Sequence, residues 1–230
     1  MPSFYVTILF LVLSFSLSAQ ADTSGMVIYR LHYNADAPEK DRFDTLYFNR
    51  TQYLYVSKWE GGQYTDGEGF NVTRSPRNKR YHYPATLTNR IALEQDYKKK
   101  AITYQSDSLE EIAWTFVDEF KEMNGYRVQK ATATGMPFNE AKNLIAWFAI
   151  DVPVRVGPHG LYGLPGLIVE GYLYPDYHHS WKLEKVEYMP VNISVPNPSD
   201  YTSKNERGKG KGKKIKDRTR FEKALNDGGR

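Results

Sequence analysis

Cysteine is absent from the 230 residues of this chain, and tryptophan occurs only four times. The absence of cysteine excludes disulfide bonds, thiolate metal sites, cysteine nucleophiles and a lipid-modified N-terminal cysteine. Hydrophobic residues make up 40% of the chain and charged residues 25%, which is typical of a globular domain rather than a disordered or fibrous chain. A domain of this length can build a sizeable core, so we expect core packing alone to stabilise it.

Recognisable catalytic motifs are absent as well. The chain has no Gly-x-Ser-x-Gly elbow, no His-Glu-x-x-His motif and no carboxylate pair of familiar spacing. The Gly-Lys pairs near the C-terminus are not a phosphate loop, because Arg207 occupies the position of the first glycine and no Ser or Thr follows Gly212-Lys213. These absences favour a protein that is not an enzyme, and we predict no cofactor.

A long apolar run occurs only at the start of the chain. Residues 4–17 carry no charge and are followed by the small residues Ser18, Ala19 and Ala21, so we predict a signal peptide over residues 1–21. The alternative is a transmembrane anchor, but the run is shorter than the roughly 20 residues that a spanning helix needs. We therefore expect a secreted or periplasmic protein with no transmembrane span after cleavage.

Basic charge is concentrated at the other end. Residues 203–230 hold 11 Lys and Arg against 4 Asp and Glu, which leaves 20 basic and 23 acidic residues in the rest of the chain. Gly and Lys alternate in this tail, so we predict that it is disordered, with a candidate short basic helix at residues 219–225. Either it is a solvated terminus or it contacts an anionic surface. Nucleic acid is not expected as a partner, because no aromatic residues are interleaved for base stacking.

Residues 22–202 are predicted to form a single β-rich domain. Val27, Tyr29 and Leu31 share one face of a segment with a period of two residues, as in a half-buried strand. Other segments with the residue types of strands follow, separated by residues typical of turns. They are residues 46–48, 53–55, 81–83, 87–93, 101–104, 144–150 and 167–174, with a Gly-rich loop at 59–69 and a lysine turn at 98–100.

The segment 109–123 fits two structures. Leu109, Ile112 and Phe116 follow helical spacing after a candidate capping box. Asn124-Gly125, however, is the strongest short signal for a β-hairpin, and the residues that follow it alternate cleanly. The local pattern does not choose between helix and strand. A short helix is also predicted at residues 137–143, before the apolar strand at 144–150.

A glycine- and proline-rich loop lies between the last two apolar segments. Leu164-Pro165-Gly166-Leu167 has the residues of a type II turn, with Gly166 at the position of positive φ. Such dense backbone specification predicts a compact loop of fixed geometry.

In this region the sequence resembles the GLPGLI family, named for the hexapeptide found here at residues 163–168. Further matching pieces stand in the family's order and cover roughly residues 25–188: Gly25, Ile28 and Tyr29, Trp114, Asn124-Gly125-Tyr126, Gln129-Lys130-Ala131, Ala146-Trp147-Phe148, Asp151-Val152-Pro153 and Gly157-Pro158. The sequence departs from the family at Val128, where many relatives have Cys, and in a longer insert at 136–144.

The resemblance implies a secreted or periplasmic protein of Bacteroidetes-type bacteria with a β-rich domain. It therefore favours a strand hairpin about Asn124-Gly125. By analogy with periplasmic lipoprotein carriers, the expected fold is a curved antiparallel sheet or half-open β-barrel with one or two short helices. The family has no established activity, so the resemblance assigns no catalytic residue.

Three hypotheses about function follow from these residues. The preferred one is a non-enzymatic accessory protein of the cell envelope that binds another envelope protein or a small apolar or sugar-like ligand. Its site would be shaped by the loop residues Gly157, Pro158, Gly163, Leu164, Pro165, Gly166, Leu167 and Ile168, or by tyrosines lining a cavity of the sheet rather than packing on one face.

The two alternatives involve ionisable residues. In one, His159, His178 and His179 handle a divalent metal, which requires that the adjacent histidines lie in a turn. In the other, Asp151 and Glu170 end the strands that flank the loop and serve as the carboxylate pair of a hydrolase.

Overall fold

In the computed structural model, the residues described are 24–32, 42–65, 71–74, 76–96, 101–135, 139–174 and 180–203. The predicted signal peptide, the lysine turn at 98–100 and the basic tail beyond 203 lie outside them. The strands are β1 (Gly25–His32), β2 (Arg42–Phe48), β3 (Gln52–Trp59), β4 (Gly62–Thr65), β5 (Asn71–Arg74), β6 (Arg77–Pro84), β7 (Asn89–Asp96), β8 (Ala101–Ser108), β9 (Thr115–Met123), β10 (Tyr126–Gly135), β11 (Asn139–Ala149), β12 (Leu167–Tyr174), β13 (Ser180–Tyr188) and β14 (Thr202–Ser203).

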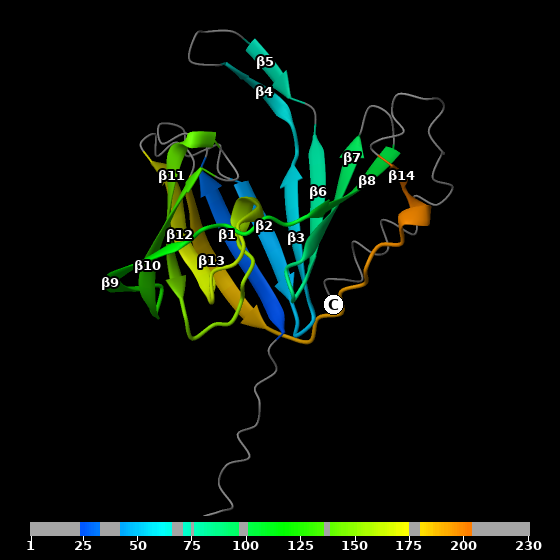
Figure 1. Ribbon diagram of the computed structural model, residues 1–230. Coiled ribbons are helices and arrows are strands. Elements are labelled where there is room, and N and C mark those ends of the chain that lie inside the picture. Colours follow the sequence, from blue (N-terminus) through cyan, green and yellow to red (C-terminus); the bar gives the residue numbers. More distant parts are fainter. Residues whose placement is uncertain are drawn as a thin grey trace, which may run out of the picture.

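Within this described part, twelve strands form one sheet in the order β14-β8-β7-β6-β3-β2-β1-β13-β12-β11-β10-β9. Neighbouring strands are antiparallel, apart from β14, which runs parallel to β8. Figure 1 shows the sheet bending so that its two halves face each other. The end strands β14 and β9 are not neighbours in the strand order, so the sheet is not closed into a barrel. The predicted curved antiparallel sheet is confirmed.

The core lies on the inner face of this curve. In β1, Val27, Tyr29 and Leu31 are fully buried, and the residues between them are only partly buried, as the period of two predicts. Tyr55 and Tyr83 on β3 and β6, and Phe148 and Trp181 on β11 and β13, belong to the same core cluster. The two halves of the sheet therefore share one core.

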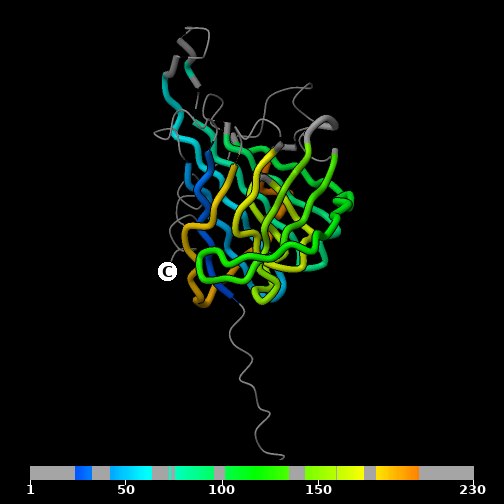
Figure 2. Tube along the Cα trace, turned by 90° about the vertical axis from the view of Figure 1, so that its left-hand side faces the viewer, coloured from blue at the N-terminus to red at the C-terminus, as the bar shows by residue number. Residues whose placement is uncertain are grey.

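The ambiguous segment 109–123 is not a helix. Residues 109–114 cross without regular structure from β8 to β9, and β9 then pairs with β10 as an antiparallel hairpin. Asn124 and Gly125 have φ values of 51° and 79°, as the two central residues of a type I′ turn require. The hairpin implied by the resemblance is confirmed. In Figure 2 this hairpin lies across the outer side of β12 and β13.

Two local predictions were wrong. The helix expected at 137–143 is replaced from Asn139 on by β11, because the ladders with β10 and β12 satisfy that backbone. The Gly-rich loop at 59–69 contains β4, which pairs with β5 as a separate two-stranded ribbon. The described helical turns are two 3₁₀ helices, Pro158–Gly160 and Pro198–Asp200, neither of which was predicted.

The C-terminal segment 189–201 leaves the sheet and returns to its far edge. The Met189 N–H donates to the Ser24 carbonyl at 3.2 Å, and the Asn49 side chain donates to the Val191 carbonyl at 3.3 Å. At the other end Tyr201 stacks on Tyr104 of β8, with ring centroids 6.2 Å apart, and β14 then pairs with β8. This segment thus covers part of one sheet edge.

Candidate functional site

The loop that carries the hexapeptide, residues 150–166, folds into the core. A bridge between Val156 and Tyr162 turns it into a small hairpin, closed by a 2.8 Å bond from the Gly157 N–H to the Leu161 carbonyl. Leu161 and Leu164 are 0% and 1% exposed. The loop therefore presents its apolar residues to the protein interior.

Glycines of this loop are needed for two different reasons. Gly160 and Gly163 have φ values of 77° and 94°, a region that L-residues rarely adopt. Gly166 does not have a positive φ, so the predicted φ of the type II turn is wrong there. A Cβ on Gly166 would instead lie 2.0 Å from the Ala149 carbonyl oxygen. Close approach of two backbones, rather than turn conformation, explains this glycine.

Contacts at its tip join the loop to the opposite half of the sheet. The Trp114 indole N–H donates to the Tyr162 carbonyl at 2.9 Å, and the Tyr162 hydroxyl donates to the Glu110 carbonyl. The Tyr162 ring lies against Tyr83 of β6, with centroids 6.4 Å apart. The loop is thus a plug inside the curved sheet, and the buried inner-face tyrosines pack in the same core.

Of the predicted motif residues, most belong to this plug. Pro165 is exposed and Gly163 is partly buried. The others are buried: Gly157, Pro158, Leu164, Gly166, Leu167 and Ile168. The motif residues therefore contribute mainly to the core, and their role in shaping a ligand site stays a prediction.

A buried polar cluster on β2 and β3 is also structural. The Asp44 carboxylate is 1% exposed, pairs with Arg42 at 2.9 Å and accepts a 2.5 Å bond from the Tyr55 hydroxyl. Burial raises the pKa of Asp44, although Arg42 and Tyr55 act in the opposite direction. Since its partners lie on the same and the adjacent strand, the cluster ties β2 to β3.

A row of four charged side chains and one tryptophan crosses the outer face of the sheet from β10 to β1. Strand register places Lys130, Trp147, Glu170, Lys182 and Arg30 opposite one another across β10, β11, β12, β13 and β1. Residues directly opposite in adjacent strands are close enough to interact. Five strands therefore contribute to one continuous site.

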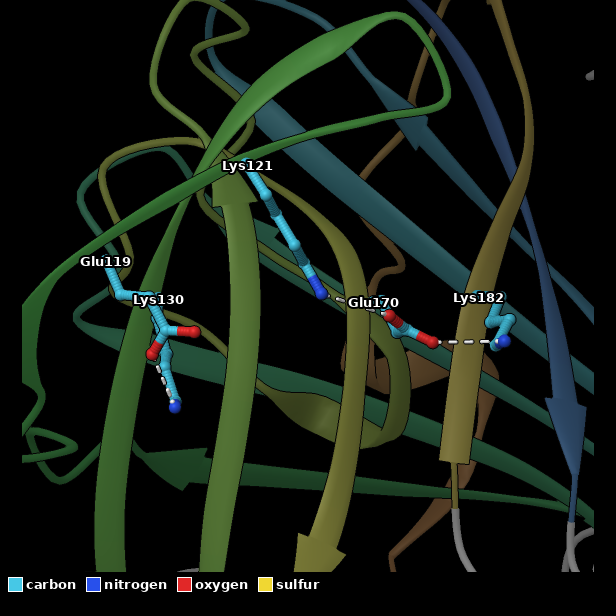
Figure 3. Close-up of polar contacts among 5 residues, drawn as sticks. All are labelled: Glu119, Lys121, Lys130, Glu170 and Lys182. Atoms are coloured by element: carbon cyan, nitrogen blue, oxygen red, sulfur yellow. Dashed lines mark hydrogen bonds and ion pairs between the residues drawn. The ribbon is translucent and has the colours of Figure 1, made fainter.

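Glu170 is the centre of this row, as Figure 3 shows. Its side chain is 17% exposed and pairs with Lys182 at 3.1 Å and with Lys121 of β9 at 3.9 Å. The Lys121 ammonium lies 3.7 Å from the centre of the Trp147 ring, within cation–π distance. Two lysines thus surround one half-buried carboxylate.

A second pair lies at the end of the row. Lys130 pairs with Glu119 at 2.7 Å, also drawn in Figure 3, and this hydrogen bond raises the pKa of Lys130. The lysine therefore stays charged at neutral pH, 5.7 Å from the Trp147 ring.

A cleft of about 520 Å³ opens beside this row. Strands β12 and β13 pair only over Glu170–Tyr172 and Ser180–Lys182. Residues 167–169 of β12 lie along β11 alone, and residues 183–188 of β13 lie along β1 alone. The cleft lies where the two strands separate. Its lining includes Val169, Glu170, Lys182, Leu183, Glu184, Lys185, Val186 and Arg30.

The tip of the β9–β10 hairpin closes one side of the cleft. Met123, Asn124 and Tyr126 line it from this hairpin. The Asn124 side-chain amide donates to the Leu183 carbonyl at 2.8 Å. This bond satisfies a strand carbonyl at the point where β12 no longer runs beside β13. The Asn124 side chain thus makes the hydrogen bond to Leu183 that a neighbouring strand would otherwise make.

The chemistry of the cleft suits binding. Arg30, Lys182 and Lys185 are basic and Glu170 and Glu184 are acidic, while Lys121 adds another positive charge next to Glu170. The Arg30–Glu184 pair at 2.6 Å is 40% and 33% exposed, so both side chains remain accessible to a ligand. Among the lining residues, basic side chains outnumber acidic ones by one, which favours an anionic ligand.

Asp151 and Glu170, the residues predicted for catalysis, do not lie opposite each other in the described strands. Asp151 lies in the exposed turn after β11, beyond the Ala149–Leu167 pair, whereas Glu170 faces Trp147 in another row. His178 and His179 lie outside the described residues, and His159 is placed only through its backbone in the 3₁₀ turn. In the described part of the chain, no three His, Cys, Asp or Glu residues are grouped for a metal ion. The metal hypothesis stays a prediction.

Glu170 could be singled out from the sequence, but its lysine partners could not. Lys121 fell in the segment left between helix and strand, and Lys182 carries no motif. The alternation of charged and apolar residues in β13 marks an outward face, but only strand register shows that this face meets Glu170.

The fold and the cleft together define the class of protein. Its members have a curved antiparallel sheet whose interior is filled by the loop between two strands, and a charged cleft on the outer side of the sheet. A family model described as "Protein of unknown function (Porph_ging)" matches residues 135–170. The matched segment contains β11, the loop with its hexapeptide at 163–168, and the start of β12 up to Glu170.

Two solved structures of PNGF-II, in different space groups, have a similar fold. Their TM-scores to this chain are 0.53 and 0.55, at 13% and 14% sequence identity. The similarity covers 74% and 80% of this chain but only 28% and 31% of the PNGF-II chain, so this fold corresponds to part of a longer protein. No curated protein sequence matches. In the described residues, no helix has the length and apolar character needed to cross a membrane.

Proposed function

We propose that this protein is a secreted or periplasmic component of the cell envelope, of the GLPGLI type, that binds a ligand and catalyses no reaction. The observation that carries the proposal is the cleft of about 520 Å³ between β12 and β13. The family match supports the assignment to the GLPGLI type, because the matched segment contains the hexapeptide. The apolar run at residues 4–17 supports the compartment.

The ligand of the cleft is anionic and small, such as a sugar acid. Lys182 and Lys121 pair with Glu170, and each ammonium has further N–H donors that can bind a carboxylate ligand. Met123, Tyr126 and Val186 line the cleft and are partly exposed, so they supply a surface for the rest of the ligand.

Titration followed by nuclear magnetic resonance tests this proposal. The probes are galacturonate and acetate, with glucose as the neutral control, at up to about 10 mM, which detects millimolar affinity. We expect galacturonate to shift the resonances of the Asn124 side chain and of the backbone around Lys182, and glucose to leave them unchanged. Unchanged cleft resonances with both acidic probes, or equal shifts with glucose, would contradict the proposal.

A pair of matched variants tests the role of charge. Lys182→Gln removes one ammonium from the cleft, and Lys58→Gln removes an exposed one from β3. Loss of a charge-assisted hydrogen bond costs about 1.5–3 kcal/mol, so Lys182→Gln should weaken galacturonate binding by about tenfold or more. Lys58→Gln should not change it. Equal effects of the two variants would show that only net charge matters.

A further inference from the structure

The cleft between β12 and β13 is bordered by two stretches of strand that do not pair with each other. The two strands pair over Glu170–Tyr172 and Ser180–Lys182, and beyond that point each keeps only its other neighbour among the described strands. An extra residue interrupts each of these remaining ladders, Val169 in β12 and Glu184 in β13, and such a bulge bends the strand that carries it. The cleft therefore opens between two strand edges inside one sheet.

Leu183 presents its backbone to this cleft. Its side chain belongs to the core cluster on the inner face, yet the residue also lines the cleft on the outer side. Its carbonyl points away from β1, because it accepts the 2.8 Å bond from the Asn124 side chain at the tip of the β9–β10 hairpin. In an antiparallel ladder the N–H and C=O of one residue point to the same side. The Leu183 N–H therefore faces the cleft too, and the carbonyl can accept a second hydrogen bond.

Charge indicates which end of a peptide suits the narrow end of the cleft. A strand placed there antiparallel to β13 has the same direction as β12, so its C-terminus lies where β12 and β13 meet. At that point Lys182 and Lys121 carry two positive charges against the single negative charge of Glu170. A C-terminal carboxylate balances these charges. A parallel strand would bring its N-terminal ammonium there instead and add to the positive excess.

The cleft also has the dimensions of a short peptide. Residues 183–186 of β13 line it, which corresponds to a length of about 13 Å at 3.3 Å per residue. Its volume of about 520 Å³ is within the usual range for sites of small ligands. Three or four extended residues therefore match its length.

We propose that the cleft binds the free C-terminal end of an extended peptide, which adds to β13 as a short antiparallel strand. The last peptide residue lies opposite Leu183: its N–H donates to the Leu183 carbonyl, and one carboxylate oxygen accepts from the Leu183 N–H. The same carboxylate accepts hydrogen bonds from the ammonium groups of Lys182 and Lys121. This inference rests on the proposed function, because it names the class of ligand that the same cleft binds.

Titration of the full chain followed by nuclear magnetic resonance tests the inference. The probes are acetyl-trialanine with a free carboxylate, the same peptide with a C-terminal amide, and galacturonate. We expect the peptide acid to shift the Leu183 and Asn124 resonances and to bind about tenfold more tightly than the other two probes.

The outcomes separate this inference from the proposed function. Galacturonate that binds as tightly as the peptide acid would overturn the inference and leave the proposed function intact. Equal affinity of the peptide acid and its amide would overturn the role of the carboxylate. Cleft resonances that no probe shifts would overturn both proposals, whereas binding of the peptide acid alone would support the inference and exclude a sugar acid.

Modified peptides test the pairing with Leu183. N-methylation of the last alanine removes the donor to the Leu183 carbonyl and should weaken binding about tenfold. N-methylation of the middle alanine, whose N–H points away from β13, is the matched control and should weaken it much less. Equal losses from the two modifications would overturn the pairing.

A protein variant tests the position of the carboxylate. Lys182→Gln should weaken binding of the peptide acid about tenfold and leave the affinity of the amide unchanged. The control Lys58→Gln, on β3, should change neither. An equal effect of Lys182→Gln on acid and amide would overturn the contact between Lys182 and the carboxylate. Unchanged circular dichroism confirms that each variant is folded.

Discussion

Gly166 gives a sharp test of the packing of the plug. The substitution Gly166→Ala adds a Cβ 2.0 Å from the Ala149 carbonyl oxygen, 2.7 Å from its carbon and 2.9 Å from the Ile150 Cα. All three atoms are backbone, so no side chain can rotate away from the new methyl group. The end of β11 has to move away from the loop instead.

The expected cost follows from opposing effects. Since the φ of Gly166 is not positive, alanine alone would stabilise the fold by about 0.4–1 kcal/mol through the unfolded state. Overpacking costs about 1–3 kcal/mol, here at the upper end because the contacts are backbone. Movement also weakens the 2.9 Å bond from the Leu167 N–H to the Val152 carbonyl, worth about 1 kcal/mol. The net destabilisation is about 3 kcal/mol.

Urea denaturation followed by tryptophan fluorescence measures this value. A loss of about 3 kcal/mol lowers the Tm of a domain of this size by roughly 6–12 °C. The matched control is Pro165→Ala at the neighbouring exposed position, which should cost less than about 1 kcal/mol. A Gly166→Ala variant as stable as the parent, or a Pro165→Ala variant equally destabilised, would refute the reasoning.

Three further predictions concern single sites. Burial, with a nearby arginine, lowers the pKa of His82 to about 4. The contribution of His82 to stability is therefore fully present above pH 6.5, and up to about 3 kcal/mol is lost as the pH falls from 6.5 to about 4. His82→Gln should flatten the pH dependence of the urea midpoint, and an unchanged dependence would contradict this prediction. Gly157→Ala places a Cβ 2.5 Å from the Ile168 Cδ1, so adding Ile168→Val, which removes that methyl group, should recover about 1 kcal/mol in a double-mutant cycle; additive effects would contradict this. Asn124→Asp keeps the turn but removes the donor to the Leu183 carbonyl and should cost about 1 kcal/mol in urea denaturation, whereas no loss would mean that the bond is not formed.

Much of the sheet could be predicted from local pattern. The alternation of Val27, Tyr29 and Leu31 indicated which face of β1 is buried, since a strand with one core face has a period of two. Asn124-Gly125 predicted a hairpin because both residues tolerate positive φ. Both signals depend only on a few adjacent residues.

Contacts between distant segments could not be predicted. Gly166 is required because the Ala149 carbonyl, 17 positions earlier in the chain, leaves no room for a side chain. The local residues had instead indicated a turn with positive φ. The helix expected at 137–143 was overruled by strands on both sides. Helical propensity is a weak preference that such pairing readily exceeds.

The cleft was the least predictable feature. It exists because β12 and β13 pair over three residues and then diverge, each following its other neighbour. Irregular pairing at Val169 and Glu184 accompanies the divergence, and neither residue type marks a bulge in the sequence. Glu170 could be named in advance, but its lysine partners depended on the register of four strand pairs.

The position of β1 has a consequence for how the chain is made. This strand is held between β2 and β13, so its second neighbour is formed by residues 180–188. At about 5–20 residues per second, synthesis of the intervening 147 residues takes roughly 7–30 s. During that time the first strand of the newly emerging chain has an open side, and any strand of another molecule can pair with it. Keeping the chain unfolded until β13 has been synthesised would prevent such pairing between molecules.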